Sequence, residues 1–203
     1  MPVIGGGHEV RRATAADLPG LSDMLARAFE DDPVTAWSSP AWGPRLGMLQ
    51  RFHRARTRHH LRHNEVWMTV GGEAAAVWAP PEAWKTTPRE DLELIAAMMT
   101  PRLAHRVPLV GRGLFGVEKA HPTHEPHWYL ATLGTNPAAQ GQGLGSAALL
   151  PVLEQCDRDG VAAYLECSKE RNVDYYARFG FRITEPLRLP RGPEVWLMWR
   201  DPR

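Results

Sequence analysis

Residues 128–181 constrain the fold more than any other stretch, because apolar runs alternate there with glycine-rich turns. Residues 128–133 are aromatic and apolar and stop at the turn-forming residues 134–137, which predicts a buried strand. Residues 147–159 then repeat apolar side chains at helical spacing, and residues 163–167 form a second apolar run. We therefore expect a parallel strand pair joined by a right-handed crossover helix.

A glycine loop separates the first of these strands from the helix. Gly141, Gly143 and Gly145 leave backbone N–H groups uncovered at a helix start, which suits an anion such as phosphate. The loop lacks the lysine of a Walker loop, and its G-x-G-x-G spacing differs from the G-x-G-x-x-G of dinucleotide folds. Glu166 does occupy the place of the ribose-binding acid in such folds, so a nucleotide-dependent oxidoreductase stays a distant alternative.

The residues around the loop carry a family resemblance. The pattern Q-x-x-G-x-G at 140–145 is followed by a helical stretch with Asn172 and Tyr176, and then by Gly180 and Phe181. This combination resembles the GNAT superfamily of acyl-CoA-dependent N-acyltransferases. The order of the motifs between residues 128 and 193 is also similar to that of the puromycin N-acetyltransferase group.

The resemblance implies one GNAT domain over residues 1–203, with an α/β (α+β) fold. Its central sheet is expected to be mixed, mostly antiparallel, built from about six to seven strands and flanked by helices. A helical insertion at about 80–126 would separate the third and fourth strands. The other predicted elements are an edge strand at 8–13, helices at 14–29, 43–63, 88–99, 102–118 and 172–179, a hairpin at 65–79, and strands at 182–189 and 194–200.

The same resemblance implies that acetyl-CoA is the co-substrate and that no metal is needed. The pantetheine arm would lie along the end of the strand, at Leu133, Gly134 and Thr135, and bond to it as an added strand does. The pyrophosphate would bind the backbone amides of the glycine loop: Gln140, Gly141, Gln142, Gly143, Leu144, Gly145 and Ser146. Asn172 is a further CoA-binding candidate, although many GNAT chains carry an asparagine at the position that Lys169 occupies here.

Amide formation by direct transfer through a tetrahedral intermediate needs a base for the amine and an acid for the leaving thiolate. Tyr176 matches the family's tyrosine near the CoA sulphur, and a phenol is protonated at neutral pH. Glu166, at the end of a strand, is the candidate base, either directly or through a water. Asp32 competes for that role, and either acid could instead only anchor the ammonium group.

The acceptor pocket is expected between the loop at 31–44 and the helical insertion. Asp32, Trp37 and Trp84 are the predicted substrate-binding residues, and Trp42, Met98, Leu114 and Phe115 would add apolar walls. We therefore expect a bulky hydrophobic primary amine of a small molecule, with puromycin the first compound to test. The alternatives are a protein or peptide N-acetyltransferase and a non-catalytic acyl-CoA-binding sensor.

Two histidine-bearing stretches have less specific interpretations. Residues 43–63 carry many arginines together with His53, His59, His60 and His63, and a solvated basic face is favoured over a nucleic-acid surface or a zinc pair at His59 and His63. His121, His124 and His127 are interpreted as loop residues rather than as a metal site.

Composition excludes some functions and sets the expected compartment. A net charge of +1 gives no case for nucleic-acid or membrane partners, and two cysteines do not make a disulfide framework. The first residues lack the pattern of a signal peptide, so a cytoplasmic protein is expected, as a monomer or homodimer.

Overall fold

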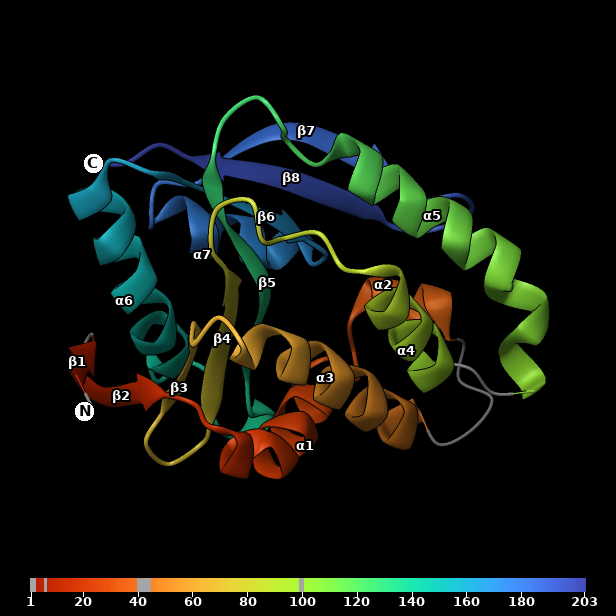
Figure 1. The fold of residues 1–203 in the computed structure, drawn as a ribbon, viewed down its shortest axis with the longest axis horizontal. Helices are drawn as coiled ribbons and strands as arrows, with labels where there is room; N and C mark the ends of the chain where they lie inside the picture. Colours follow the sequence, from red (N-terminus) through yellow and green to blue (C-terminus); the bar gives the residue numbers. More distant parts are fainter. Residues whose placement is uncertain (1–2, 6, 40–44, 99–100) are drawn as a thin grey trace.

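The computed structural model describes residues 3–5, 7–39, 45–98 and 101–203. Within them, one sheet of eight strands has the order β1-β2-β3-β4-β5-β6-β8-β7 (Figure 1). The strands are β1 (Val3–Gly5), β2 (His8–Arg12), β3 (Val66–Thr69), β4 (Ala74–Ala79), β5 (His127–Thr135), β6 (Ala162–Cys167), β7 (Arg182–Arg188) and β8 (Glu194–Arg200).

The sheet is mostly antiparallel, as predicted, and β5 and β6 are its parallel pair. It has one strand more than the six to seven expected. The extra strand is β1, which pairs with β2, so the strand predicted at 8–13 is present but does not form the edge of the sheet. A strand of three residues is too short to show an alternating pattern, which is why the sequence did not reveal it.

Helices cover both faces of the sheet. They are α1 (Leu18–Ala28), α2 (Pro33–Ser38), α3 (Arg45–Leu61), α4 (Pro88–Met98), α5 (Val107–Ala120), α6 (Leu144–Asp159) and α7 (Val173–Ala177). The crossover helix α6 buries Leu149, Val152 and Leu153 against one face, together with Trp78 and Leu130. On the other face α1 packs against β3 and β4, and α5 lies alongside β8 (Figure 1).

Two features open the sheet between β5 and β6. The β5–β6 ladder stops at the pair Leu130↔Leu165, whereas β4 stays paired with β5 as far as Thr135. In addition, Val77 pairs with Thr132 and Trp78 with Leu130, so Ala131 is an extra residue on β5. Such a bulge bends and twists its strand. The two parallel strands consequently diverge at their carboxyl ends.

The stretch predicted as a loop at 31–44 contains α2. Asp32 caps this helix by accepting the backbone N–H groups of Val34 and Thr35 at 2.9 and 3.0 Å, and Pro33 takes its first position. Trp42 lies outside the described residues. The predicted insertion is present between β4 and β5 and supplies α4 and α5.

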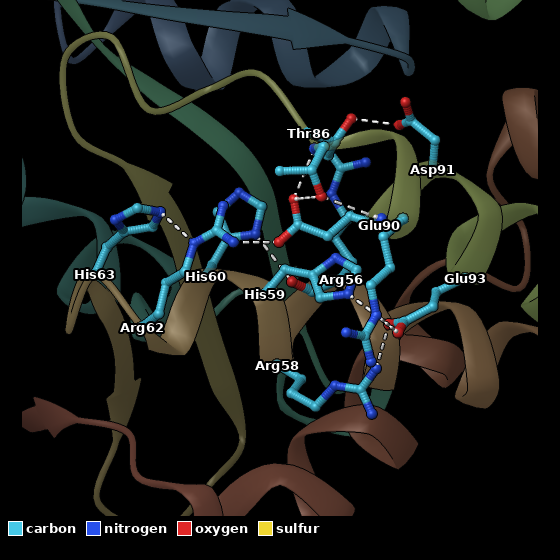
Figure 2. A network of polar contacts seen from close by, with 12 residues as sticks. Arg56, Arg58, His59, His60, Arg62, His63, Thr86, Glu90, Asp91 and Glu93 are labelled. Carbon is cyan, nitrogen blue, oxygen red and sulfur yellow. Dashed lines mark hydrogen bonds and ion pairs between the residues drawn. The ribbon is translucent and has the colours of Figure 1, made fainter.

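The prediction of a solvated basic face at 43–63 was wrong for most of its histidines. His53, His59 and His60 are buried on α3. Acids of α4 pair with α3: Glu93 accepts from Arg58 at 2.5 Å and from His59 at 2.9 Å, and Glu90 pairs with Arg62 (Figure 2). These acids lie about thirty residues away along the chain, so spacing within the helix gave no sign of them.

Candidate active site

A cavity of about 500 Å³ occupies the opening between β5 and β6. Its walls come from the end of β5, the glycine loop, the end of β6, α7 and the α1–α2 junction. The cavity therefore lies at the carboxyl ends of parallel strands, where α/β folds bind their ligands.

The glycine loop forms one wall. Gly141 and Gly143 have φ values of 81° and 82°, which glycine adopts without strain, and Gly143 caps the N-terminus of α6. A Cβ on Gly145 would lie 2.9 Å from Thr135 Oγ1, so only glycine lets α6 approach the end of β5 this closely. The loop thus presents bare backbone to the cavity beside the positive end of a helix, which fits a diphosphate.

The structure brings nearly all the predicted donor-binding residues to this cavity. Those that line it are Leu133, Gly134, Thr135, Gln140, Gly141, Gly143, Leu144, Gly145, Ser146 and Asn172. Gln142 is the exception, since it is absent from the lining and its carbonyl oxygen lies 2.8 Å from His8 Nε2. Lys169 and Arg171 also line the cavity and pair with Asp31, the arginine at 2.9 Å.

Tyr176 lines the cavity from α7 and is 8% exposed. Burial, together with nearby Cys167 and Tyr175, raises the pKa of its phenol well above the ordinary value. The phenol is therefore protonated at neutral pH and can donate its proton. Tyr175 has different surroundings, because its hydroxyl lies 3.3 Å from Ser146 Oγ beside the glycine loop.

Glu166 and Asp32 both line the cavity but differ in what surrounds their carboxylates. Asp32 holds the start of α2 with one oxygen and accepts from the Ser168 hydroxyl with the other. Glu166 accepts the Tyr129 hydroxyl on Oε2 at 2.7 Å, and its Oε1 lies 3.5 Å from His121 Nδ1. Glu166 consequently has the freer oxygen for a proton.

The predicted substrate-binding tryptophans lie in different places. Trp84 stacks on His121 with 3.7 Å between ring centroids, but it does not line the cavity itself. Trp37 is 7% exposed and does not line the cavity: its indole N–H donates to the Pro190 carbonyl, and its ring fills the space above Gly192. Leu114 and Phe115, expected as pocket walls, are 48% and 66% exposed on α5 and are also absent from the lining.

Sequence reasoning missed a polar group beside Glu166. His121 and His127 were interpreted as loop residues, yet both are buried, and their Nε2 atoms lie 3.0 Å apart. Arg56 of α3 donates to the Ala131 carbonyl at 2.9 Å and to the Tyr129 hydroxyl at 3.3 Å. Tyr129 lies within the apolar sequence of β5, and an aromatic residue in a strand usually fills a core. The sequence therefore gave no indication of these polar contacts.

Fold and cavity together place the protein among the N-acyltransferases. It belongs to the Acetyltransferase (GNAT) family, which matches residues 74–181, more than half of the chain. GNAT enzymes use acetyl-CoA as co-substrate, and the protein is an acetyltransferase.

Individual relatives agree with this assignment. An uncharacterized N-acetyltransferase of Schizosaccharomyces pombe is 25% identical over 208 residues, which cover 95% of this chain and 83% of the relative. A Corynebacterium glutamicum structure of histone acetyltransferase HPA2 and related acetyltransferase is 26% identical, with a TM-score of 0.64 and 96% of each chain covered. The polyamine N-acetyltransferase of Drosophila melanogaster, which forms N-acetylagmatine, shares the fold at 16% identity, a TM-score of 0.64, and coverage of 95% of this chain and 98% of its own.

Two features are absent from the described residues. They contain no group of three histidine, cysteine or acidic side chains arranged to hold a metal ion. None of their helices combines the length and the apolar character that crossing a lipid bilayer requires.

Proposed function

We propose that the protein transfers an acetyl group from acetyl-CoA directly to a primary amine of a small molecule. The observation that carries this proposal is that one cavity contains the glycine loop, the Glu166 carboxylate and the Tyr176 phenol. Acetyl-CoA, when bound, supplies an activated thioester. Glu166 accepts one proton from the ammonium group, the Tyr176 hydroxyl donates its proton to the departing sulphur, and the second proton that the nitrogen loses on forming the amide restores the phenol. Backbone N–H groups at the end of β5, near Leu133 and Gly134, would hold the carbonyl oxygen of the thioester.

Cys167 supports direct transfer over an acyl-enzyme route. Its thiol lines the cavity, but burial raises its pKa to about 11. The thiol also donates to the Lys169 carbonyl at 3.1 Å. A buried, protonated thiol is a poor nucleophile at neutral pH, so the amine itself is the attacking group.

Aromatic side chains near Glu166 support a small acceptor with an aromatic body. Phe29 lines the cavity, and His121, on which Trp84 stacks, lies 3.5 Å from the Glu166 carboxylate. Aromatic surfaces with one acid suit an amine that carries a flat apolar group. A puromycin-like aminoacyl compound has this chemistry.

Initial rates of thiol release from acetyl-CoA test the proposal. The acceptors are puromycin, phenethylamine, agmatine, spermidine and a peptide containing lysine. We expect puromycin or phenethylamine to give the highest kcat/KM. A higher value for the peptide, or thiol release that no amine in the series increases, would contradict the proposal. The Gly143→Asp enzyme gives the background rate of thiol release, because its glycine loop can no longer bind a phosphate.

A further inference from the structure

Two buried histidines extend from Glu166 into the protein, away from the cavity. His121 follows α5 and is 5% exposed, and His127 begins β5 and is 3% exposed. Their Nε2 atoms lie 3.0 Å apart, and His121 Nδ1 lies 3.5 Å from Glu166 Oε1. The three side chains therefore form a continuous line of proton-binding atoms.

The hydrogen bonds of His127 determine where the protons lie on both rings. His127 Nδ1 is 2.9 Å from the Glu125 carbonyl oxygen, which can only accept, so Nδ1 carries a hydrogen. Burial lowers the pKa of His127, so this ring is neutral and its Nε2 is an acceptor. His121 must then donate from Nε2. In its neutral form His121 is left with a lone pair on Nδ1, facing Glu166.

Three aromatic rings surround His121. The face of Trp84 stacks on it at 3.7 Å, and the rings of Tyr129 and Tyr164 meet it edge-on at 4.9 and 4.7 Å. An indole face attracts a cation. Tyr129 already donates to Glu166 Oε2, which leaves Oε1 as the oxygen nearer His121.

Other charged groups in this region contact the neighbours of His121 and Glu166. Arg56 ends on the Tyr129 hydroxyl and the Ala131 carbonyl, and Lys85 lies 5.2 Å from the centre of the Trp84 ring. His124 and Glu125 influence His127 from the preceding loop. Among the described side chains, Glu166 is the acid that pairs with His121, with 3.5 Å between Oε1 and Nδ1.

We propose that His121 is a positioning residue that takes up the proton which Glu166 removes from the amine. This rests on the proposed role of Glu166 as base. First the ammonium N–H bond breaks and a Glu166 Oε1–H bond forms, directly or through one water. That O–H bond then breaks, and a His121 Nδ1–H bond forms. Glu166 is again a carboxylate, His121 is an imidazolium, and the proton returns through Glu166 to solvent after the product has left.

Nitrogen-15 NMR of histidine-labelled protein tests the arrangement without any acceptor. Nδ1 and Nε2 shifts distinguish the two neutral tautomers, and a pH titration follows uptake of the second proton. We expect neutral His121 to carry its hydrogen on Nε2. In Glu166→Gln protein the pH at which His121 takes up its second proton should fall by at least about half a unit, because the neighbouring negative charge is gone. The exposed-residue variant His124→Gln should leave this titration unchanged.

Neutral His121 with its hydrogen on Nδ1, or a His121 titration that Glu166→Gln leaves in place, would overturn the proposal. These outcomes need no turnover, so they are separable from a failure of the proposed function, in which no amine would be acetylated.

The pH dependence of turnover supplies a kinetic test, with phenethylamine as acceptor. In His121→Gln enzyme we expect kcat to fall about tenfold and the acidic limb of kcat/KM to move by at least about half a pH unit, while the KM for acetyl-CoA stays the same. His127→Phe keeps a ring but removes the acceptor for His121, and should move the same limb. A lower melting temperature with an unmoved pH profile in both variants would reduce His121 to a packing residue.

Discussion

The two ends of the cavity are assembled in different ways. The donor end comes from residues 133–146 and 172–176, and its conformation follows from local features: a strand end, a glycine loop and a helix start. The proposed acceptor end combines Asp32 and Glu166, which line the cavity, with His121 and Trp84 behind Glu166, and these residues come from four separate segments. The conformation of the donor end depends on residues that are adjacent in sequence. The acceptor end depends on contacts between residues far apart in sequence, which sequence spacing does not predict.

The largest expected effect is at the donor end. Gly143→Asp places a carboxylate where a diphosphate is expected, and acetyl-CoA affinity should fall at least about a thousandfold. Gly143→Asn is the matched control, because asparagine has the same shape and tolerates the left-handed backbone that φ of 82° requires. Calorimetry should show a much smaller loss for asparagine. Equal losses would mean that backbone strain, and not charge, decides binding.

A second change tests where the two ends meet. Tyr176→Phe should lower kcat by about a hundredfold and leave acetyl-CoA binding intact, as loss of a general acid does. Tyr175→Phe, one residue earlier, removes the contact with Ser146 and should alter the KM for acetyl-CoA more than kcat. Single-turnover rates measure the chemical step. If Tyr176→Phe enzyme kept wild-type single-turnover rates, Tyr176 would not be the general acid.

The helix α3 behind the acceptor end gives a pH prediction. Burial lowers the pKa of His53 to about 3 and that of His60 to about 4, whereas the unfolded chain binds these protons near 6.5. Between those limits the unfolded state holds more protons, so stability is fully present above pH 6.5 and falls as the pH drops.

Urea unfolding at pH 7 and pH 5 measures this effect. The His53→Leu protein should lose about 2 kcal/mol less than wild type between the two pH values, because one proton-binding difference is gone. His124→Leu changes an exposed histidine and should follow wild type. Identical losses in all three proteins would contradict the burial of His53.

The smallest expected effect on activity comes from one of the two tryptophans, Trp84. Trp84→Ala should lower kcat/KM for aromatic amines about tenfold, since the ring that stacks on His121 and holds it near Glu166 is lost. Trp37→Ala should instead reduce stability by about 3 kcal/mol, the cost of emptying a core position, with the KM for the amine unchanged. Acceptor kinetics and melting curves are measured on both variants. Loss of activity in Trp37→Ala with loss of stability in Trp84→Ala would contradict these roles.

The sequence predicted the fold well where a single element carries its own signal. β8 has the predicted bounds, Gly160 ends α6 in the left-handed conformation, and the parallel pair with its crossover helix is present. It failed at α2, although Asp32 and Pro33 are good residues for a helix start, because tryptophan-rich polar segments were interpreted as a loop.

The site could be predicted to the same extent. Tyr176, Glu166 and the glycine loop do share one cavity, since family motifs fix these positions. Trp37 was assigned to the pocket by its residue type, but the glycines that its ring covers, Gly113 and Gly192, are distant in sequence. Likewise the line from Glu166 through His121 to His127 exists only because the chain returns to β5 after the insertion.

Amide NMR during an acetyl-CoA titration tests the central claim most directly. The proposed donor site is the cavity between β5 and β6, so the backbone resonances of residues 133–135 and 141–146 should shift together and saturate. Resonances of the exposed strand β7 should stay in place. Saturable shifts confined to residues outside the cavity lining, or none at millimolar acetyl-CoA, would contradict the account.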